Sequence, residues 1–323
     1  MMPANLATNL TFTDYHPVPA DFYEEIVAGL NQTPKRIAPK FFYDARGSQL
    51  FEAICDLPEY YPTRIEKKIL MDHVDAISKA MGPHCCIIEP GSGSSDKVRL
   101  LLDAVNPRGY MPLEISKSHL LSAMDRLTQD FPWLDVHAVC IDFTGDLTVP
   151  DHQDDAHRVA FFPGSSIGNF EPVDAMRFLR DLRAVVGDDG GLLIGVDLKK
   201  DEATLNAAYN DAAGVTADFN KNLLVRINAE LDGDFDLDAF RHRAFYNADA
   251  GRIEMHLVSA CAQTVRVGAH TFSFSEGETI HTENSYKYTV REFQDLARAT
   301  GFRPVETWTD ANELFSLQYF AAA

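Results

Sequence analysis

Glycines and acidic residues gather in the string IIEPGSGSSDK, which joins an apolar run to a helical pattern. Glu89 ends the apolar run, and Gly91 and Gly93 follow it. Glycines at such a turn let the backbone approach a ligand closely, and ligands of open α/β sheets bind beyond the carboxyl ends of the strands. A dinucleotide fingerprint requires a third glycine where Asp96 stands, so that motif is excluded. The remaining interpretations are a cofactor-binding turn of another class and a plain strand-to-helix turn.

Two further acidic residues stand at the ends of the next two apolar runs. Glu114, in LEIS, stands at a strand end about twenty residues after the glycines, where an acidic residue can accept hydrogen bonds from both hydroxyls of a ribose. Asp142 is followed by Phe143, a pair that suits the amino group and the ring face of an adenine. A lone acid at such a place is most often a solvated loop residue. Three acids at the ends of three successive strands instead indicate a nucleoside-containing cofactor.

The elements that must position these residues alternate between strand and helix. Because strands alternate with helices of this length, we predict a parallel, doubly wound sheet with helices on both faces. The predicted strands are CCIIEP, GYMPLEIS, 136–141, 159–162 and GGLLIGVDL, and the predicted helices are 96–105, 117–129 and 173–186.

The pattern differs before and after this alternating segment. Helices are predicted over 19–31, 48–57 and 63–81, the last with a capping box of Thr63 and Glu66. From Asp201 a long helical stretch runs to Leu231, and three strands over 243–248, 252–262 and 263–274 indicate an inserted α+β lobe. A helix over 290–300 and two β-like runs, 303–308 and 314–320, complete the sheet.

The composition limits the kinds of partner. The chain has 323 residues, 46% of them hydrophobic, and 29 Lys and Arg against 48 Asp and Glu, which makes a formal charge of −19. Such an acidic protein repels phosphate backbones, so we expect no nucleic-acid partner and no membrane-surface role. The five cysteines are odd in number and lack a C-x-x-C pair, which favours unpaired thiols, no bound metal and a cytoplasmic location. No leader or transmembrane segment is expected.

Several strings, among them KFFYDARGSQLFEAICDLPEYYPTR, GSSIGNFEP, AAYNDAAGVTADFN, RIEMHL and TENSYKYT, make the chain similar to a known family. It resembles the histidine-specific N-α-methyltransferases of ergothioneine biosynthesis over nearly its whole length. The resemblance implies a class I methyltransferase fold, a Rossmann-like doubly wound sheet, with a second α+β lobe. It assigns residues 62–200 and 288–323 to the core that binds S-adenosylmethionine, residues 17–61 and 201–287 to the substrate-binding lobe, and residues 1–16 to a flexible N-terminal tail.

The resemblance also implies a reaction, in which the α-nitrogen of free L-histidine is methylated three times to give hercynine. The family usually has Asp in place of Glu114 and Leu or Tyr in place of Pro90, and these departures leave the substrate set intact. The implied cofactor-binding residues are Tyr43, Gly91, Lys97, Glu114, Asp142 and Phe143. The implied histidine-binding residues are Tyr60, Gly164, Asn169, Tyr209, Met255, Glu283 and Ser285.

These residue types suit the implied chemistry. Asn169 and Tyr209 can donate to a carboxylate, and Glu283 and Ser285 can accept from and donate to the two nitrogens of an imidazole. Asn169 can also orient the amine, and Tyr43 or water can accept its proton, so Asn169 and Tyr43 are the predicted catalytic residues. The faces of Tyr43, Phe51 and Tyr60 suit a quaternary ammonium product.

Ordinary structural roles compete with these assignments. Taken alone, Glu283 would be a surface acid, Met255 a packing residue and His281 a solvated loop histidine.

Two other functions remain open from the sequence. The chain could methylate another free amino acid or small amine, such as tryptophan, although a bulky apolar ring would leave Glu283 unpaired. It could also be a non-catalytic nucleoside-binding module on the same fold. We expect a small-molecule substrate and a monomer.

Overall fold

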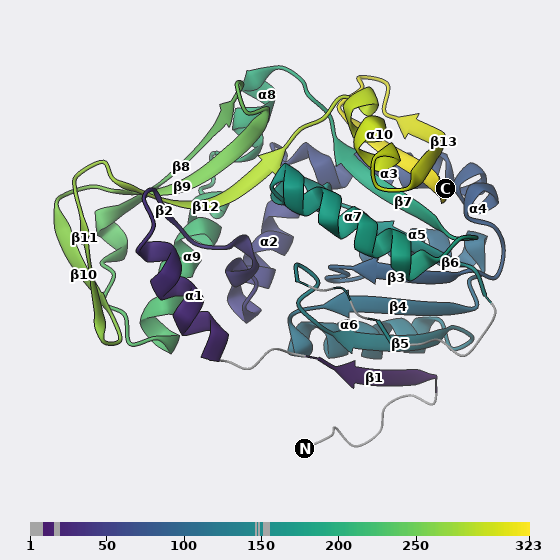
Figure 1. Ribbon diagram of the computed structural model, residues 1–323, viewed down its shortest axis with the longest axis horizontal. Coiled ribbons are helices and arrows are strands. Elements are labelled where there is room, and N and C mark those ends of the chain that lie inside the picture. Colours follow the sequence, from purple (N-terminus) through teal and green to yellow (C-terminus); the bar gives the residue numbers. More distant parts are fainter. Residues whose placement is uncertain (1–8, 16–19, 146, 148, 151–155) are drawn as a thin grey trace. The chain divides into compact units, whose positions relative to one another are not determined.

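A computed structural model describes residues 9–15, 20–145, 147, 149–150 and 156–323 (Figure 1). The chain forms two compact units. The first unit comprises residues 1–16, 62–199 and 288–323, and the second comprises residues 17–61 and 200–287. No helix in the described part of the chain is long and apolar enough to cross a membrane.

The first unit contains an eight-stranded sheet in the order β1-β5-β4-β3-β6-β7-β14-β13. All neighbours from β1 to β7 pair in parallel, and β14 is antiparallel to both β7 and β13. The strand order reverses between β3 and β6, which is the switch point where doubly wound sheets bind ligands. The strands are β1 (Leu10–Asp14), β3 (Cys86–Pro90), β4 (Gly109–Glu114), β5 (Asp135–Cys140), β6 (Arg158–Phe162), β7 (Gly191–Asp197), β13 (Phe302–Thr309) and β14 (Phe315–Ala322).

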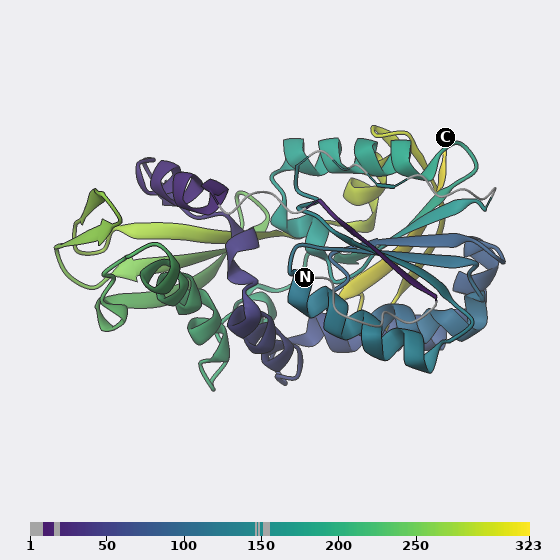
Figure 2. The ribbon, with the colours of Figure 1, turned by 90° about the horizontal axis from the view of Figure 1, so that it is seen from below.

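Helices cover both faces of this sheet, which confirms the predicted doubly wound α/β fold (Figure 2). Buried hydrophobic clusters lie on both faces of the sheet. Because strands covered on both sides have no solvent face, they consist of nearly continuous apolar residues. One face carries α3 (Tyr61–Asp72), α4 (Val74–Met81), α5 (Asp96–Val105) and α6 (Lys117–Asp130), and the other carries α7 (Pro172–Val186) and α10 (Val290–Arg298).

The prediction of an N-terminal tail is wrong for residues 10–14, which form the edge strand β1. This strand pairs in parallel with β5, from Leu10 opposite Val136 to Asp14 opposite Cys140. Leu10 is buried in the core, and the three residues that follow it, Thr11, Phe12 and Thr13, are β-branched or aromatic, as strands favour. Residues 1–8 of the predicted tail lie outside the described residues.

The helix predicted over 63–81 is two helices that meet at His73, where the backbone leaves the helical region with φ −121° and ψ 16°. The first of them, α3, already begins at Tyr61, with Pro62 in its first turn, a position where proline is favoured. Thr63 therefore lies inside the helix, and the predicted capping box with Glu66 is wrong.

The second unit contains a four-stranded sheet, β2-β12-β9-β8, and the hairpin β10-β11. The helix predicted over 201–231 is wrong in one respect, because it breaks into α8 and α9 before Gly214, whose φ of +77° favours glycine. The strands are β2 (Lys35–Arg36), β8 (Phe240–Asn247), β9 (Arg252–Ser259), β10 (Gln263–Val267), β11 (His270–Phe274) and β12 (Thr279–Tyr286). The helices are α1 (Ala20–Leu30), α2 (Ala45–Cys55), α8 (Glu202–Ala208) and α9 (Val215–Glu230), with 3-10 turns η1 (Pro39–Phe42) and η3 (Leu237–Ala239).

Candidate active site

The glycine-rich turn between β3 and α5 leaves open space at the switch point. Gly91 and Gly93 have φ values of +67° and +51°, which side chains rarely adopt. A Cβ on Gly93 would meet no described atom within 4 Å, whereas a Cβ on Gly91 would lie 3.2 Å from the ring of Phe143. The turn therefore brings Phe143, which follows β5, against the backbone that follows β3.

Glu114 ends β4 beside this turn, and its carboxylate is held by backbone N–H groups. One oxygen accepts from Ile115 at 2.9 Å and from Ser116 at 3.1 Å, and the other accepts from Gly93 at 3.1 Å. A carboxylate offers about four acceptor positions. The three backbone hydrogen bonds fill three of these positions and orient the carboxylate. One acceptor position on Oε2 is left for a ligand hydroxyl.

Asp142 and Phe143 follow β5 at the same edge of the sheet. Asp142 Oδ1 accepts hydrogen bonds from the backbone and hydroxyl of Thr144, at 3.0 Å and 2.5 Å. The Phe143 ring lies edge-on to Phe162 at 6.2 Å between centroids. Gly91, Glu114, Asp142 and Phe143 are thus assembled around the ends of three neighbouring strands.

Glu89, the third acid of the pattern, has its hydrogen-bond partner inside the protein. It is buried, and Tyr110 donates a hydrogen bond to its carboxyl group at 2.5 Å. Burial raises the pKa of Glu89 to about 8, against the lowering effect of the Tyr110 hydrogen bond. Glu89 is therefore largely protonated at neutral pH and is bonded to Tyr110 rather than offered to a ligand.

Glu66 connects Lys97 to the loop after β6, although the sequence predicted it as part of a capping box. Lys97 Nζ lies 2.6 Å from a carboxylate oxygen of Glu66, which is fully buried. The backbone N–H of Gly164 donates to both oxygens of the same carboxylate, at 2.9 Å each. A Cβ on Gly195 would lie 1.9 Å from that carboxylate, so only glycine leaves room for it. The available signal was the position of Glu66, one helical turn from the buried Ile69 and Leu70.

Asn169 ends the 3-10 turn η2 (Ser166–Asn169) in the loop after β6. Gly164 and Ser165 precede this turn with φ values of +83° and +56°, and the Ser165 hydroxyl accepts from the backbone of Asp197 at 2.9 Å. The Asn169 side chain is half-buried and forms no hydrogen bond with any residue that the structure describes. Its amide is therefore available to a ligand.

Of the substrate residues predicted in the second unit, Glu283 and Ser285 lie on strand β12, a strand that was not predicted from the sequence. Glu283 pairs with Met255 of β9, and His281 pairs with His256, with a register shift between the two pairs. Because Met255 and His256 are adjacent on one strand, they face opposite sides of the sheet. The irregularity therefore separates His281 from Glu283. His281 is buried and stacks on His256 at 4.6 Å between centroids, so the predicted solvated loop histidine is wrong.

Ser285 follows Glu283 on the same face of β12 and takes part in a buried network. Tyr209 Oη donates to Ser285 Oγ at 2.9 Å. Lys287 Nζ donates to Ser285 Oγ at 2.8 Å and to Tyr209 Oη at 3.2 Å. Lys287 is 2% exposed and was not among the predicted site residues. The signal that could have found it is its spacing, because residues 283, 285 and 287 share one face if the segment is a strand.

The Glu283 carboxyl group is a largely buried acceptor without a donor among the described residues. Its residue is only 9% exposed, and no residue in the described part of the chain donates a hydrogen bond to its carboxylate. Burial raises the pKa of Glu283 to about 7, and the positive charge of Lys287 limits the rise. Because an unsatisfied buried acceptor is costly, this position favours a ligand that brings an N–H.

Aromatic rings form a connected series in the same unit. Tyr43 lies edge-on to Phe51 at 5.8 Å, Phe51 to Tyr60 at 6.3 Å, and Tyr60 to Tyr209 at 6.1 Å between ring centroids. Burial raises the pKa of Tyr60, and its neighbours Tyr209 and Glu283 add to the rise. Tyr43 thus lies in the second unit, whereas the other predicted cofactor residues lie in the first.

Glu254, His256 and His281 place possible metal-ligand atoms within 4.8 Å of one another. The Glu254 carboxylate is already bonded by Arg252 at 2.8 Å and by His256 at 3.0 Å. Although burial opposes it, hydrogen bonds from His256 and Arg252 hold the pKa of Glu254 at about 2. The arrangement is that of an ion-pair network.

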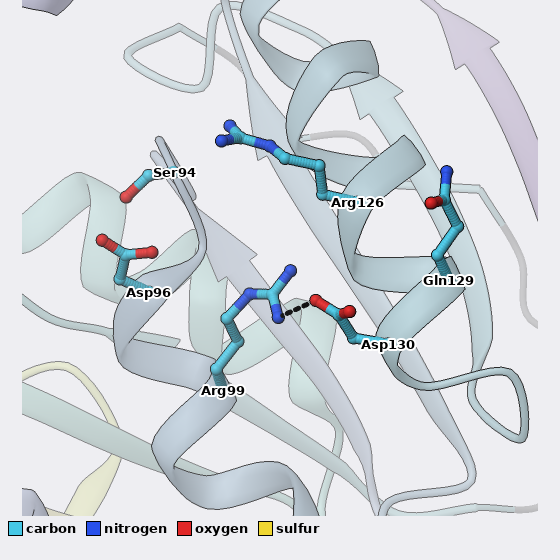
Figure 3. Close-up of a pocket in the computed structure, with 6 residues that line it drawn as sticks. All are labelled: Ser94, Asp96, Arg99, Arg126, Gln129 and Asp130. Atoms are coloured by element: carbon cyan, nitrogen blue, oxygen red, sulfur yellow. Dashed lines mark hydrogen bonds and ion pairs between the residues drawn. The ribbon is translucent and has the colours of Figure 1, made fainter.

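A separate surface pocket lies between α5 and α6 (Figure 3). Arg99 of α5 and Asp130 of α6 face each other across it in an ion pair at 2.6 Å. None of the predicted site residues is among the described residues that line it, which are Ser94, Asp96, Arg99, Arg126, Gln129 and Asp130.

The strand order, with its antiparallel β14 between β7 and β13, and the glycine turn define the class of protein. The strand order is that of the class I methyltransferase fold, and the family model that the chain matches makes it an S-adenosylmethionine-dependent methyltransferase. Residues 22–322 match the model of a family described as histidine-specific, S-adenosylmethionine-dependent methyltransferases, and the chain belongs to this family.

Curated relatives share most of the chain. A histidine N-α-methyltransferase from Mycolicibacterium smegmatis is 42% identical over 91% of this chain and 92% of that protein. One from Mycobacterium tuberculosis is 40% identical over 92% of this chain and 94% of that protein. Ergothioneine biosynthesis protein 1 from Neurospora crassa is 32% identical over 87% of this chain and 32% of that protein.

The residues at the switch point fit S-adenosylmethionine, the cofactor of this family. The space at Gly93 admits a ligand close to the backbone, and Glu114 keeps an acceptor position for a ribose hydroxyl. The Phe143 ring, packed against Gly91, offers an apolar surface to a base.

Proposed function

We propose that this enzyme methylates the α-nitrogen of L-histidine three times and releases hercynine, the first step of ergothioneine biosynthesis. The observation that carries the proposal is the Glu283 carboxyl group, which is buried without a hydrogen-bond donor from the described residues, two positions from Ser285. Membership of the histidine-specific family and the names of the relatives support the same substrate.

On the cofactor side, we assign the binding of S-adenosylmethionine to Gly91, Lys97, Glu114, Asp142 and Phe143, with Tyr43 contributing from the second unit. The bound cofactor would supply a methyl group on a sulfonium sulfur. The sulfur is the leaving group and becomes a neutral thioether. Glu114 accepts from the ribose, while Glu66 keeps the Lys97 ammonium in place. These residues act by positioning, which accounts for large accelerations in displacement reactions.

On the substrate side, Glu283 accepts an N–H of the imidazole and Ser285 donates to its other nitrogen. Met255, paired with Glu283 across the sheet, supplies an apolar wall beside the ring. A phenyl or indole side chain would leave this polar pair unsatisfied, and such mismatches reduce kcat/KM by up to about 10⁴-fold. Asn169 and Gly164 of the loop after β6, with Tyr60, hold the carboxylate and amine. Tyr209 donates its hydrogen to Ser285 and can only accept from the amine.

The α-amino group must lose a proton before each transfer, because only the free electron pair can form the new N–C bond as the C–S bond breaks. Asn169 orients this nitrogen, and Tyr43 or water carries its proton away. The product has no N–H left. The aromatic series of Tyr43, Phe51 and Tyr60 suits a quaternary ammonium, at about 0.5–2 kcal/mol for each cation–π contact.

We further propose that residues 62–200 and 288–323 bind the cofactor and that residues 17–61 and 201–287 bind the amino acid. The enzyme acts on a free small molecule rather than on nucleic acid, as a monomer in the cytoplasm. The five free cysteines support a reducing compartment, and the charge of −19 argues against a polyanionic partner.

Mass spectrometry of the reaction with S-adenosylmethionine tests the function. With histidine we expect mono-, di- and trimethylated products. Absence of all three at saturating substrate contradicts the proposal. A panel that includes tryptophan and tyrosine tests an N-methyltransferase for another amine. Cofactor binding without turnover of any amine would indicate a nucleoside-binding module instead.

A further inference from the structure

Ser285 sits at the centre of the buried network on strand β12. Its hydroxyl oxygen receives hydrogen bonds from Tyr209 Oη at 2.9 Å and from Lys287 Nζ at 2.8 Å. A serine hydroxyl has two acceptor positions and a single donor hydrogen. With both acceptor positions filled, Ser285 can offer a ligand only its hydrogen.

Lys287 fixes the direction of the hydrogen bonds at Ser285. An ammonium group has only donor hydrogens, so its contacts to Ser285 and Tyr209 cannot reverse direction, as contacts between two hydroxyl groups can. Lys287 Nζ also lies 3.2 Å from Tyr209 Oη and so fills an acceptor position on the tyrosine, which favours donation by Tyr209 toward Ser285. All three residues are buried, and hydrogen bonds from a charged donor are stronger there than in water.

We propose that Lys287 is a positioning residue for ring recognition, which holds Ser285 as an obligate donor and makes the site require a ring nitrogen without hydrogen. Glu283, when ionised, is an obligate acceptor on the same strand face. The pair therefore presents one acceptor and one donor. This set complements a neutral imidazole and is mismatched to a ring whose second nitrogen is replaced by C–H. The inference rests on the proposed function. It explains how the same site distinguishes histidine from an amino acid whose ring has the N–H but lacks the second nitrogen.

The test compares histidine with pyrrol-2-ylalanine and pyrrol-3-ylalanine, which keep an N–H at either ring position and lack the acceptor nitrogen. The readout is the ratio of kcat/KM for histidine to that for the better pyrrole isomer. For the wild-type enzyme we expect a ratio of about 100 or more, because one buried partner is left unpaired. Lys287→Met, in which Ser285 is free to accept, should lower this ratio by about tenfold and raise the histidine KM with a smaller change in kcat.

A double-mutant cycle separates this role from a merely structural one. In a Ser285→Ala background, Lys287→Met should leave the ratio unchanged, because the hydroxyl group through which Lys287 acts is gone. Lys35→Met is the matched control: it removes a largely buried lysine from β2, which pairs with β12, and its partner is Glu278. This control should keep the wild-type ratio.

Several outcomes overturn the inference. A folded Lys287→Met enzyme with the wild-type ratio does so, as does an equal effect in the Ser285→Ala background. If Lys287→Met does not fold, Tyr209→Phe removes the other donor to Ser285, and an unchanged ratio there also overturns it. Failure of the wild-type enzyme to methylate histidine would contradict the proposed function instead, and the ratio of dissociation constants for the same ligands would still test Lys287.

Discussion

Glu66 and Lys97 form an ion pair in which the two charged groups are 2.6 Å apart and the carboxylate is fully buried. The same carboxylate accepts both hydrogen bonds of the Gly164 backbone N–H. One acidic residue of α3 thus connects the helix that follows the glycine turn to the loop after β6. Lys97 is therefore held in position by Glu66, a residue that lies outside the glycine-rich segment.

Replacement of Glu66 by Gln should weaken cofactor binding. The amide still accepts from Gly164, but it no longer neutralises Lys97, and loss of one member of a buried pair costs up to about 3–5 kcal/mol. Calorimetry with S-adenosylhomocysteine should show a dissociation constant raised by about tenfold or more, with a lower Tm. Lys67→Met is the control, because Lys67 is the next residue of α3, is only half-buried and has its Nζ 3.8 Å from a carboxylate oxygen of Asp96. Wild-type affinity in Glu66→Gln would contradict the assignment.

Replacement of Glu114 by Ala should affect the cofactor alone. The variant loses the acceptor position offered to the ribose and also the carboxylate that orients the backbone of Gly93. Because hydrogen bonds to charged groups contribute about 1.5–3 kcal/mol, we expect the dissociation constant for S-adenosylhomocysteine to rise by about tenfold to a hundredfold. Glu114→Gln keeps one acceptor oxygen, so its dissociation constant should lie between those of the wild type and Glu114→Ala. A rise in histidine KM without a change in cofactor affinity would refute this role.

Replacement of Glu283 by Ala should affect the amino acid alone. The imidazole N–H then loses its acceptor in a buried site, and we expect the histidine KM to rise by about a hundredfold. Titration with S-adenosylhomocysteine should give near wild-type affinity. Glu278→Ala serves as the control, since Glu278 pairs with Lys35 near the start of the same strand. Equal losses of cofactor and histidine binding in Glu283→Ala would rule out a specific role in ring recognition.

Replacement of Glu89 by Gln should change how stability depends on pH. The pKa of Glu89 is about 8 in the folded protein and 4.5 in the reference state, so the folded protein retains a proton that the unfolded chain releases. The stabilisation from this group is complete below the unfolded pKa and is lost as pH rises toward the folded pKa. Glu89→Gln keeps an acceptor for Tyr110 and does not titrate.

Urea unfolding from about pH 5 to about pH 8 measures this effect. The free energy of unfolding of Glu89→Gln should rise relative to the wild type as the pH increases. A difference that is the same at every pH would show that Glu89 does not carry a raised pKa.

Local patterns predicted the first unit well. The helix over 96–105 matches α5, and every strand of the alternating segment was found to within a few residues. The acids Glu114 and Asp142 were correctly placed at the carboxyl ends of their strands, and parallel strands bring these ends to one edge of the sheet. Such inferences need only the spacing along the chain.

The residues that were missed or misread depend on contacts distant in sequence. Glu66 has the spacing of a capping box, yet its partners are Lys97 and Gly164. TENSY contains polar residues and lacks the alternation of a half-buried strand, but pairing with β9 makes it the second half of β12, where most of its residues are buried. In the same way, residues 10–14 become a strand only because β5 has an open edge.

The doubly wound sheet, the glycine turn and the acids at the strand ends follow from the amino-acid sequence, because apolar periodicity and turn chemistry are local. Which polar groups find partners depends on the folded chain. It pairs Tyr110 with Glu89, Glu66 with Lys97, and Lys287 with Ser285, and it leaves Glu283 without a donor among the described residues. Burial sets the free energy of each polar group, and burial depends on segments that meet only in the folded chain.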